Sequence, residues 1–108
     1  MKILITGAYG MLGRTLCRVL NNFEIIPTDR DTMDITKSDE VYRVIREHQP
    51  QVVIHCAAMT AVDLCETEKE NAFLLNAVGS SNVAVACHAI GARLIAISTD
   101  YVLSLIHI

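Results

Sequence analysis

Three regularly spaced glycines constrain this chain more than any other feature of its sequence. In the stretch "ITGAYGMLGR", Gly7, Gly10 and Gly13 lie between an apolar run at residues 2–6 and a segment at residues 11–20. The run predicts a strand buried on both faces, and the segment carries apolar residues at helical spacing. Between a strand and a helix, such glycines allow a sharp turn, close approach of a pyrophosphate to the backbone and close helix packing. The stretch therefore predicts a dinucleotide-binding loop; the alternative is a glycine-rich turn that serves helix packing alone.

The rest of the chain alternates short apolar runs with helical patterns. The runs at residues 24–29, 52–58 and 93–98 predict strands, and the patterns at residues 39–48 and about 62–90 predict helices. With the first strand and helix, the order is β-α-β-α-β-α-β. Such units build a parallel sheet with right-handed crossovers and helices on both faces. The expected fold is therefore α/β, a Rossmann-like, doubly wound parallel sheet.

Single residues set the expected ends of these elements. Ser38 is placed to cap the second helix, and Gly91 is placed to close the third. Pro27 fits best if its strand lies at an edge of the sheet, because proline cannot donate a hydrogen bond to a neighbouring strand. A joint in the long third helix is expected near residues 76–81, where asparagine, glycine and serine gather.

Composition narrows the class of protein. The chain has 108 residues and a net charge of -3, so we expect one small domain that does not bind nucleic acid. No apolar run is long enough to cross a bilayer, so no membrane partner is expected. The four cysteines form no C-x-x-C pair and the four histidines show no metal-binding spacing. We therefore expect reduced cysteines, a cytoplasmic location, no metal site, and structural roles for His55 and His88.

Two charged residues after the second predicted strand bear on the cofactor. Asp29 stands where dinucleotide-binding units place the acid that hydrogen-bonds the adenosine ribose. Arg30, next to it, has the charge and geometry to pair with a 2′-phosphate. The two side chains favour different cofactors, so NADPH or NADH is expected to bind.

The spacing G-x-x-G-x-x-G resembles that of the extended short-chain dehydrogenase/reductase superfamily. The blocks "MDIT", "HCAAMTAVDLCETE", "NAVGSSNVAVAC" and "ISTDYV" narrow the resemblance to the dTDP-4-dehydrorhamnose reductase family, over residues 1–102. The resemblance implies an enzyme that reduces the 4-keto group of dTDP-4-dehydro-L-rhamnose with NADPH or NADH. The regulatory β subunit of methionine adenosyltransferase, which binds a dinucleotide, is similar too. Sugar-nucleotide dehydratases and epimerases share the glycine loop, so both alternatives stay open.

The resemblance carries functional residues over to this sequence. Together with Arg30, it implies a cofactor site made of Gly7, Gly10, Met11, Leu12, Gly13, Asp29, Asp34, Ile35, Ala57, Ala58, Met59, Thr60 and Ile97. Asp34 and Ile35 would contact the adenine. Thr99 matches a hydroxyl that assists the catalytic tyrosine and lysine of the superfamily. Thr99, Asp100 and Tyr101 would face the nucleotide sugar. The expected partner of the parent enzyme is that nucleotide sugar, with a homodimer left open.

Several of these residues also have a purely structural interpretation. Ala57 and Ala58 could be small only for packing of a helix on the sheet. Asp34 could cap the entry to the following helix. Thr99 and Asp100 could simply end a strand.

The sequence lacks the motif that donates a proton in the reaction of the superfamily. The superfamily supplies the proton for the carbonyl oxygen from the tyrosine of a Tyr-x-x-x-Lys motif, whose lysine lowers the tyrosine pKa. None of the three tyrosines here has a lysine four residues on. Thr99 alone cannot supply that proton, so this stretch of chain is expected to be inactive by itself.

The ending "LSLIHI" departs from the family as well. The family follows "STDYV" with phenylalanine and a short loop that contains glycine, and residues 103–108 match one reading frame of a transposon-end adapter used in DNA sequencing. We therefore expect residues 1–102 to be the N-terminal part of a dinucleotide-binding domain and residues 103–108 to be a non-native tail. The sheet would be truncated after about four strands, with the strand at residues 93–98 at an exposed edge and the substrate domain absent.

Overall fold

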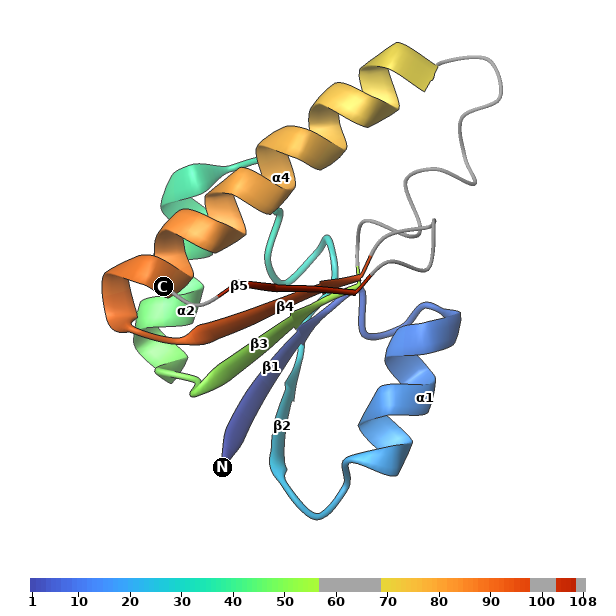
Figure 1. Cartoon of the computed structure of the whole chain (residues 1–108), viewed down its shortest axis with the longest axis vertical. Coiled ribbons are helices and arrows are strands. Elements are labelled where there is room, and N and C mark those ends of the chain that lie inside the picture. The colour runs from blue at the N-terminus through green and yellow to red at the C-terminus, as the bar shows by residue number, and fades with distance from the viewer. Residues whose placement is uncertain (57–68, 98–102, 107–108) are drawn as a thin grey trace.

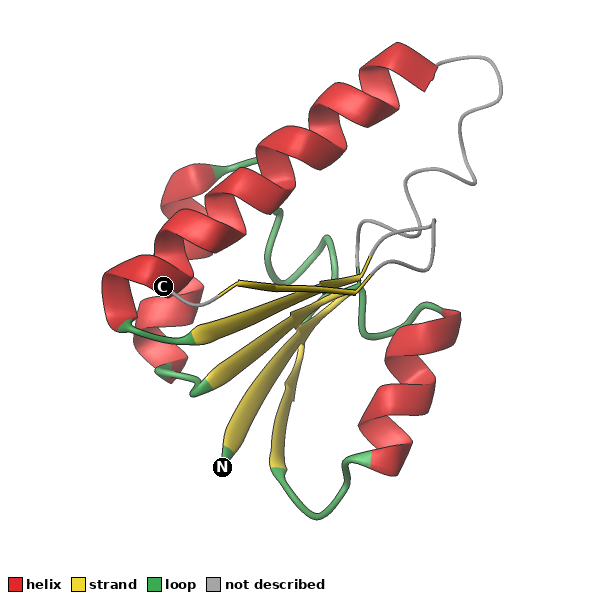
Figure 2. Cartoon of the chain, viewed as in Figure 1, coloured by secondary structure: helices red, strands yellow, loops and turns green. Residues whose placement is uncertain are grey.

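The computed structural model describes residues 1–56, 69–97 and 103–106, which form one sheet with helices on both faces (Figures 1 and 2). The strands are β1 (Lys2–Thr6), β2 (Glu24–Pro27), β3 (Val52–His55), β4 (Arg93–Ile97) and β5 (Leu103–Ile106). The helices are α1 (Met11–Val19), α2 (Ser38–His48) and α4 (Lys69–Ile90).

The sheet has the order β2-β1-β3-β4-β5, and its first four strands run parallel. Each parallel strand is joined to the next along the chain through a segment that contains a helix. This confirms the predicted α/β, Rossmann-like architecture. Because the four strands are parallel, their carboxyl ends meet at one edge of the sheet, where such folds bind ligands.

The two faces of the sheet are covered unequally. On one face, Leu4, Val53 and Leu94 pack with α2 and α4 in a single buried cluster. On the other face, Ile3, Ile5 and Ile54 form a second cluster together with residues of α1. Figure 2 shows α2 and α4 on one side of the sheet and α1 alone on the other. The strands alternate between these two cores, as a sheet buried on both faces requires.

The edge beyond β4 differs from the expectation. β5 pairs antiparallel with β4 in the register Leu94↔Ile106 to Ile97↔Leu103. The prediction that the strand at residues 93–98 lies at an exposed edge is therefore wrong. An open edge presents unpaired N–H and C=O groups, and the uncharged segment at residues 103–106 satisfies them by adding a strand.

Helix α4 runs without a break through residues 76–81, so the expected joint there is wrong. Ile35 explains why a glycine, Gly79, lies inside this helix. A Cβ at Gly79 would lie 2.5 Å from Cδ1 of Ile35, so any other residue would force this side chain to shift from its place against α4. The predicted end of the helix is confirmed: Gly91 has a φ of 73°, and Ala92 N–H donates to the carbonyl of Cys87 at 2.9 Å.

Helix α2 begins one residue earlier than predicted. Ser38 is its first residue, Lys37 occupies the N-cap position, and no side chain caps the helix. The predicted cap by Ser38 is therefore wrong. Asp39 and Glu40 lie in the first turn instead, where their charges favour the positive end of the helix. Pro27 lies on β2 at the edge of the sheet, as predicted.

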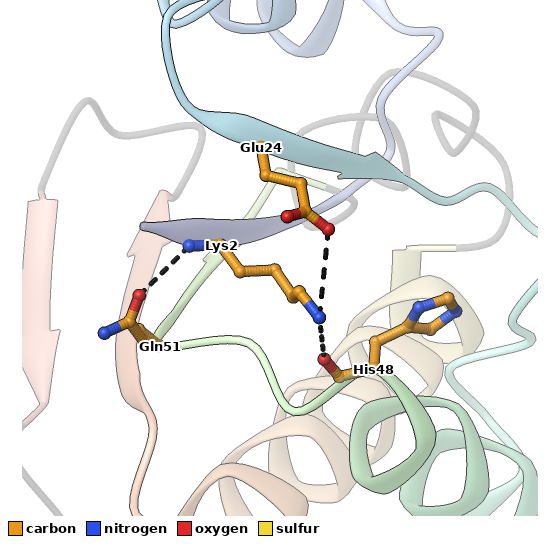
Figure 3. Close-up of polar contacts among 4 residues, drawn as sticks. All are labelled: Lys2, Glu24, His48 and Gln51. Atoms are coloured by element: carbon orange, nitrogen blue, oxygen red, sulfur yellow. Dashed lines mark hydrogen bonds and ion pairs between the residues drawn. The ribbon is translucent and has the colours of Figure 1, made fainter.

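The amino end of the sheet is tied together by Lys2 (Figure 3). Its Nζ donates to the carbonyl of His48, the last residue of α2, at 3.0 Å and lies 3.8 Å from Oε2 of Glu24. Its backbone N–H donates to Oε1 of Gln51 at 3.1 Å. The ammonium group thus lies at the negative end of α2 while its backbone joins β1 to the residue before β3.

Among the helices in the described parts of the chain, none is long and apolar enough to cross a membrane.

Candidate functional site

The glycine loop lies where β1 ends and α1 begins, at the carboxyl edge of the sheet. Gly7 has a φ of 61°, a conformation that favours glycine, and its carbonyl accepts the N–H of Gly10 at 3.1 Å. Gly10 is the N-cap of α1. The turn out of the strand therefore takes only a few residues and directs the start of the helix over the edge of the sheet.

Gly13 is the point of closest approach between α1 and this turn. A Cβ there would lie 2.2 Å from the carbonyl oxygen of Gly7 and 2.7 Å from Cα of Ala8. At Gly10 the nearest atom to a Cβ is the same oxygen, at 3.4 Å, which is an ordinary contact. Glycine at position 13 thus serves helix packing, whereas the protein itself leaves room for a side chain at position 10.

The first turn of α1 is open to an anion. No side chain caps the helix at Gly10, and no acidic residue lies in its first turn. The first N–H groups of a helix have no partner within the helix, and the helix dipole makes this end positive. Met11, whose side chain is 90% exposed, lies at this end. The backbone here fits a pyrophosphate group, which needs N–H donors and no bulky side chain in the way.

Asp29 follows β2 at the same edge. Its Oδ1 accepts the N–H of Asp31 at 3.0 Å, the N–H of Thr32 at 3.0 Å and the hydroxyl of Thr32 at 3.1 Å. These hydrogen bonds build a tight turn and fix the carboxylate. Oδ2 has no hydrogen bond within the described residues, and the neighbouring Arg30 is exposed. The geometry leaves one oxygen of Asp29 for a ligand.

The predicted adenine-contacting pair lies in the connection before α2. Asp34 accepts the hydroxyl of Thr36 at 2.6 Å and the N–H of Thr36 at 3.0 Å, and these hydrogen bonds lower the pKa of Asp34. Its own N–H donates to the carboxylate of Glu40. Asp34 therefore builds a turn and does not cap α2, whose N-cap position is Lys37.

Ile35 is half-buried, and its position is set by α4. Its side chain packs against Gly79, and its carbonyl accepts Nδ2 of Asn82 at 2.9 Å. Contact with an adenine remains a prediction for this residue. Ile97 ends β4 and packs partly buried against the core on the α1 side of the sheet.

The remaining predicted site residues lie outside the described part of the chain. They are Ala57, Ala58, Met59, Thr60, Thr99, Asp100 and Tyr101.

The sequence analysis expected a structural role for His55 but did not predict that buried polar side chains gather at the carboxyl edge. In the described residues, Thr6, Thr28 and His55 are buried, and each lies at or just beyond the carboxyl end of β1, β2 or β3. Thr28 donates its hydroxyl to the carbonyl of Ile5 at 3.0 Å, and its own carbonyl accepts the N–H of Ala8 at 3.0 Å. A polar residue ending an otherwise apolar strand was the signal that could have identified them.

The three described cysteines are poor nucleophiles. Burial, with Cys17 nearby, raises the pKa of Cys56 to about 11, and burial raises the pKa of Cys87 to about 12. Burial also raises the pKa of Cys17. All three carry free thiols. Since the thiolate is the reactive form, these side chains act as small apolar groups at neutral pH.

Fold and loop together define a class: Rossmann-like proteins in which a glycine loop opens the first helix. The model of the RmlD substrate binding domain family matches residues 1–104, and the chain belongs to this family. The match confirms the predicted resemblance to the dTDP-4-dehydrorhamnose reductases.

Individual relatives agree with this assignment. A dTDP-4-dehydrorhamnose reductase of Streptomyces griseus is 45% identical over 101 residues, which are 92% of this chain and 33% of that protein. The spore coat polysaccharide biosynthesis protein SpsK of Bacillus subtilis (strain 168) is 41% identical over 103 residues, with 94% and 36% covered. The crystal structure of dTDP-4-dehydrorhamnose reductase from Bacillus anthracis in complex with NADP has a TM-score of 0.78 at 44% identity, with 86% and 34% covered. The chain thus spans about a third of the length of these relatives.

Proposed function

We propose that this chain is the dinucleotide-binding part of a reductase that converts dTDP-4-dehydro-L-rhamnose to dTDP-L-rhamnose with NADPH or NADH. The observation that carries the proposal is the open N-terminus of α1, reached from β1 through Gly7 at a φ of 61°. Its family supplies the substrate class, since the similar proteins of Streptomyces griseus and Bacillus anthracis carry the reductase name.

The described residues would divide the cofactor among them. Gly7, Gly10, Met11, Leu12 and Gly13 would hold the pyrophosphate on backbone N–H groups. The free oxygen of Asp29 would accept from the adenosine ribose, or Arg30 would pair with a 2′-phosphate. Asp34 and Ile35 would border the adenine, and Ile97 would back the nicotinamide. Ala57, Ala58, Met59 and Thr60 are proposed beside the cofactor by resemblance alone.

Bound NADPH or NADH would supply the hydride. Thr99, Asp100 and Tyr101 are proposed to face the nucleotide sugar, with Thr99 assisting the proton donor. That donor, the tyrosine of Tyr-x-x-x-Lys, does not occur in these 108 residues. General acid catalysis contributes roughly 10²–10⁴ in rate, so the described chain would bind cofactor but would not turn over ketosugar by itself.

The test is oxidation of NADPH or NADH on addition of dTDP-4-dehydro-L-rhamnose to the full-length protein, with binding of each dinucleotide measured separately. Turnover supports the reductase. Binding without turnover favours the alternative of a non-catalytic subunit similar to the methionine adenosyltransferase β subunit. Absence of binding of both NADPH and NADH, or equal binding by a Gly10→Ala variant, would remove the dinucleotide site. Alanine suits the purpose because the fold leaves room for a Cβ at Gly10 but an approaching pyrophosphate would not.

Three further proposals concern the context of the chain. Residues 1–102 are proposed to be the N-terminal part of the dinucleotide-binding domain, on the coverage of the relatives. Residues 103–108 are proposed to be adapter-derived, and genomic DNA beyond codon 102 tests this. A cytoplasmic location is proposed on the free thiols of the three described cysteines.

A further inference from the structure

A buried histidine joins three elements beside the glycine loop. His55 is the last residue of β3 and is 0% exposed. Its Nδ1 lies 2.7 Å from Oγ1 of Thr6, the last residue of β1. Its Nε2 lies 3.0 Å from Oγ of Ser80 in α4. Each ring nitrogen is therefore hydrogen-bonded to a hydroxyl on a different element.

The register of the sheet places these contacts on the face under α4. Thr6 and His55 are direct partners across β1 and β3. Leu4 and Val53, two residues earlier on the same strands, belong to the core beneath α2 and α4. Side chains two residues apart on a strand share a face, so Thr6 and His55 point the same way. On β4 the partner of His55 is Ala96, which has only a methyl group.

The ring carries no charge near pH 7. Burial lowers the pKa of His55 to about 4. A neutral imidazole donates from one nitrogen and accepts at the other, and a hydroxyl can do either. Both contacts can therefore form in either tautomer, and no charge is left buried.

An apolar side chain at this position would need no polar partners. Filling the core therefore does not explain why a histidine with two hydrogen bonds lies here. Thr6 directly precedes Gly7, where the positive φ begins the glycine loop. Ser80 directly follows Gly79, where α4 packs against Ile35. The hydrogen bonds thus join the start of the glycine loop to the part of α4 that is itself packed on the connection before α2.

We propose that His55 is a positioning residue of the dinucleotide site, which holds the start of the glycine loop in place through Thr6 and anchors it to α4 through Ser80. The inference rests on the proposed dinucleotide binding and goes beyond it, because the assigned residue lies beneath the loop. Loss of the two hydrogen bonds should let the loop shift while the sheet stays folded. Binding of the pyrophosphate should weaken, because its donors would no longer be held in place.

The test compares four variants of the full-length protein. His55→Leu removes both hydrogen bonds and leaves an apolar side chain, whereas Ser80→Ala removes one hydrogen bond. His55→Gln keeps an amide that can reach a hydroxyl. Val53→Ala is the matched control, because it removes buried volume from the same strand and face without touching either hydroxyl. Urea unfolding gives the folded fraction of each variant, and NADPH fluorescence gives its dissociation constant.

We expect His55→Leu to bind NADPH about tenfold more weakly, which corresponds to about 1.4 kcal/mol. Ser80→Ala should lose less, His55→Gln should recover part of the loss, and Val53→Ala should bind as the wild type does despite its lower stability. Equal affinity of His55→Leu and wild type, or equal losses in His55→Leu and Val53→Ala, would overturn the positioning role. If His55→Leu does not fold, unchanged affinity in both folded variants, Ser80→Ala and His55→Gln, overturns it. A wild type that binds neither NADPH nor NADH overturns the proposed function and, with it, this inference.

Discussion

Alanine at Gly13 and alanine at Gly10 should separate the two roles of the glycine loop. A Cβ at Gly13 would lie 2.2 Å from the carbonyl oxygen of Gly7 and 2.7 Å from Cα of Ala8. Both neighbours are backbone atoms, so no side-chain rotation relieves the clash and α1 must move away from the turn. At Gly10 the nearest atom lies at 3.4 Å, and alanine fits.

For Gly13→Ala, the expected change in the free energy of unfolding is opposite in sign to that of Gly→Ala in an exposed helix. In an exposed helix, Gly→Ala stabilises by about 1 kcal/mol. Forcing a methyl group into a filled site costs roughly 1–3 kcal/mol, and a backbone neighbour places Gly13 at the upper end of that range. We therefore expect the free energy of unfolding of Gly13→Ala to fall by about 2 kcal/mol net. For Gly10→Ala we expect a loss below about 1 kcal/mol, because alanine is a poorer N-cap than glycine.

Urea unfolding followed by circular dichroism, together with an NADPH titration, checks both variants in the full-length protein. Gly13→Ala should be clearly less stable. Gly10→Ala should unfold close to wild type but bind NADPH more weakly, because its methyl group stands where the pyrophosphate approaches. A Gly13→Ala protein at least as stable as wild type would refute the packing argument, since the helix effect would then act alone.

Three other predictions follow from single contacts. Gly79→Val should destabilise the protein by about 1–3 kcal/mol in urea unfolding, because a Cβ there meets Ile35 at 2.5 Å; an unchanged midpoint would contradict the contact. The preference between NADPH and NADH should stay below about a thousandfold, or ~4 kcal/mol, because Asp29 and Arg30 favour different cofactors; a larger ratio of dissociation constants would show that one of them points away. His55 has its pKa lowered from 6.5 to about 4. The unfolded chain therefore binds a proton that the folded protein does not, and the free energy of unfolding should fall by about 3 kcal/mol as the pH drops through that window. His55→Gln should flatten the pH profile, and equal slopes would count against the burial.

Most of the fold was predictable because it depends on local patterns. Short apolar runs predict strands, and the segments between them, whose apolar residues have helical spacing, predict helices. Their regular alternation leaves a parallel sheet as the main possibility. Gly91 and Pro27 act through their own backbone chemistry, so their places at a helix end and at an edge strand could be read directly. The same holds for Gly7, which takes a positive φ.

Features that depend on distant partners were not predictable in this way. Gly79 looks like a helix breaker until Ile35, far away in the sequence, is known to occupy the space beside it. Ser38 looks like a cap, but the turn built by Asp34 and Thr36 starts the helix one residue earlier. β5 was missed because pairing at an edge depends on open backbone groups of β4 and on little in the sequence of the added strand.

The candidate site, like the fold, was predictable from the sequence only in part. The spacing of the glycines predicts an opened first helix, and the structure adds that Gly13 is required by packing while Gly10 leaves room for a side chain. The sequence places Asp29 after β2, but only the structure shows that one of its oxygens is used by the turn at Asp31 and Thr32. The role of His55 depends on contacts with two other elements, so its position in the sequence alone indicates only a buried residue.

The two ends of the sheet are held by different kinds of contact. At the amino end, Lys2 makes partly exposed contacts with Glu24 and with the end of α2, and exposed ion pairs contribute little to stability. At the carboxyl end, the polar contacts of Thr6 and His55 are buried, and buried hydrogen bonds are costly to leave unmade. Polar groups in a core are expected where a position must be fixed and not merely filled. They lie next to the glycine loop, at the edge where parallel sheets bind their ligands, and this is the edge where we propose that the dinucleotide binds.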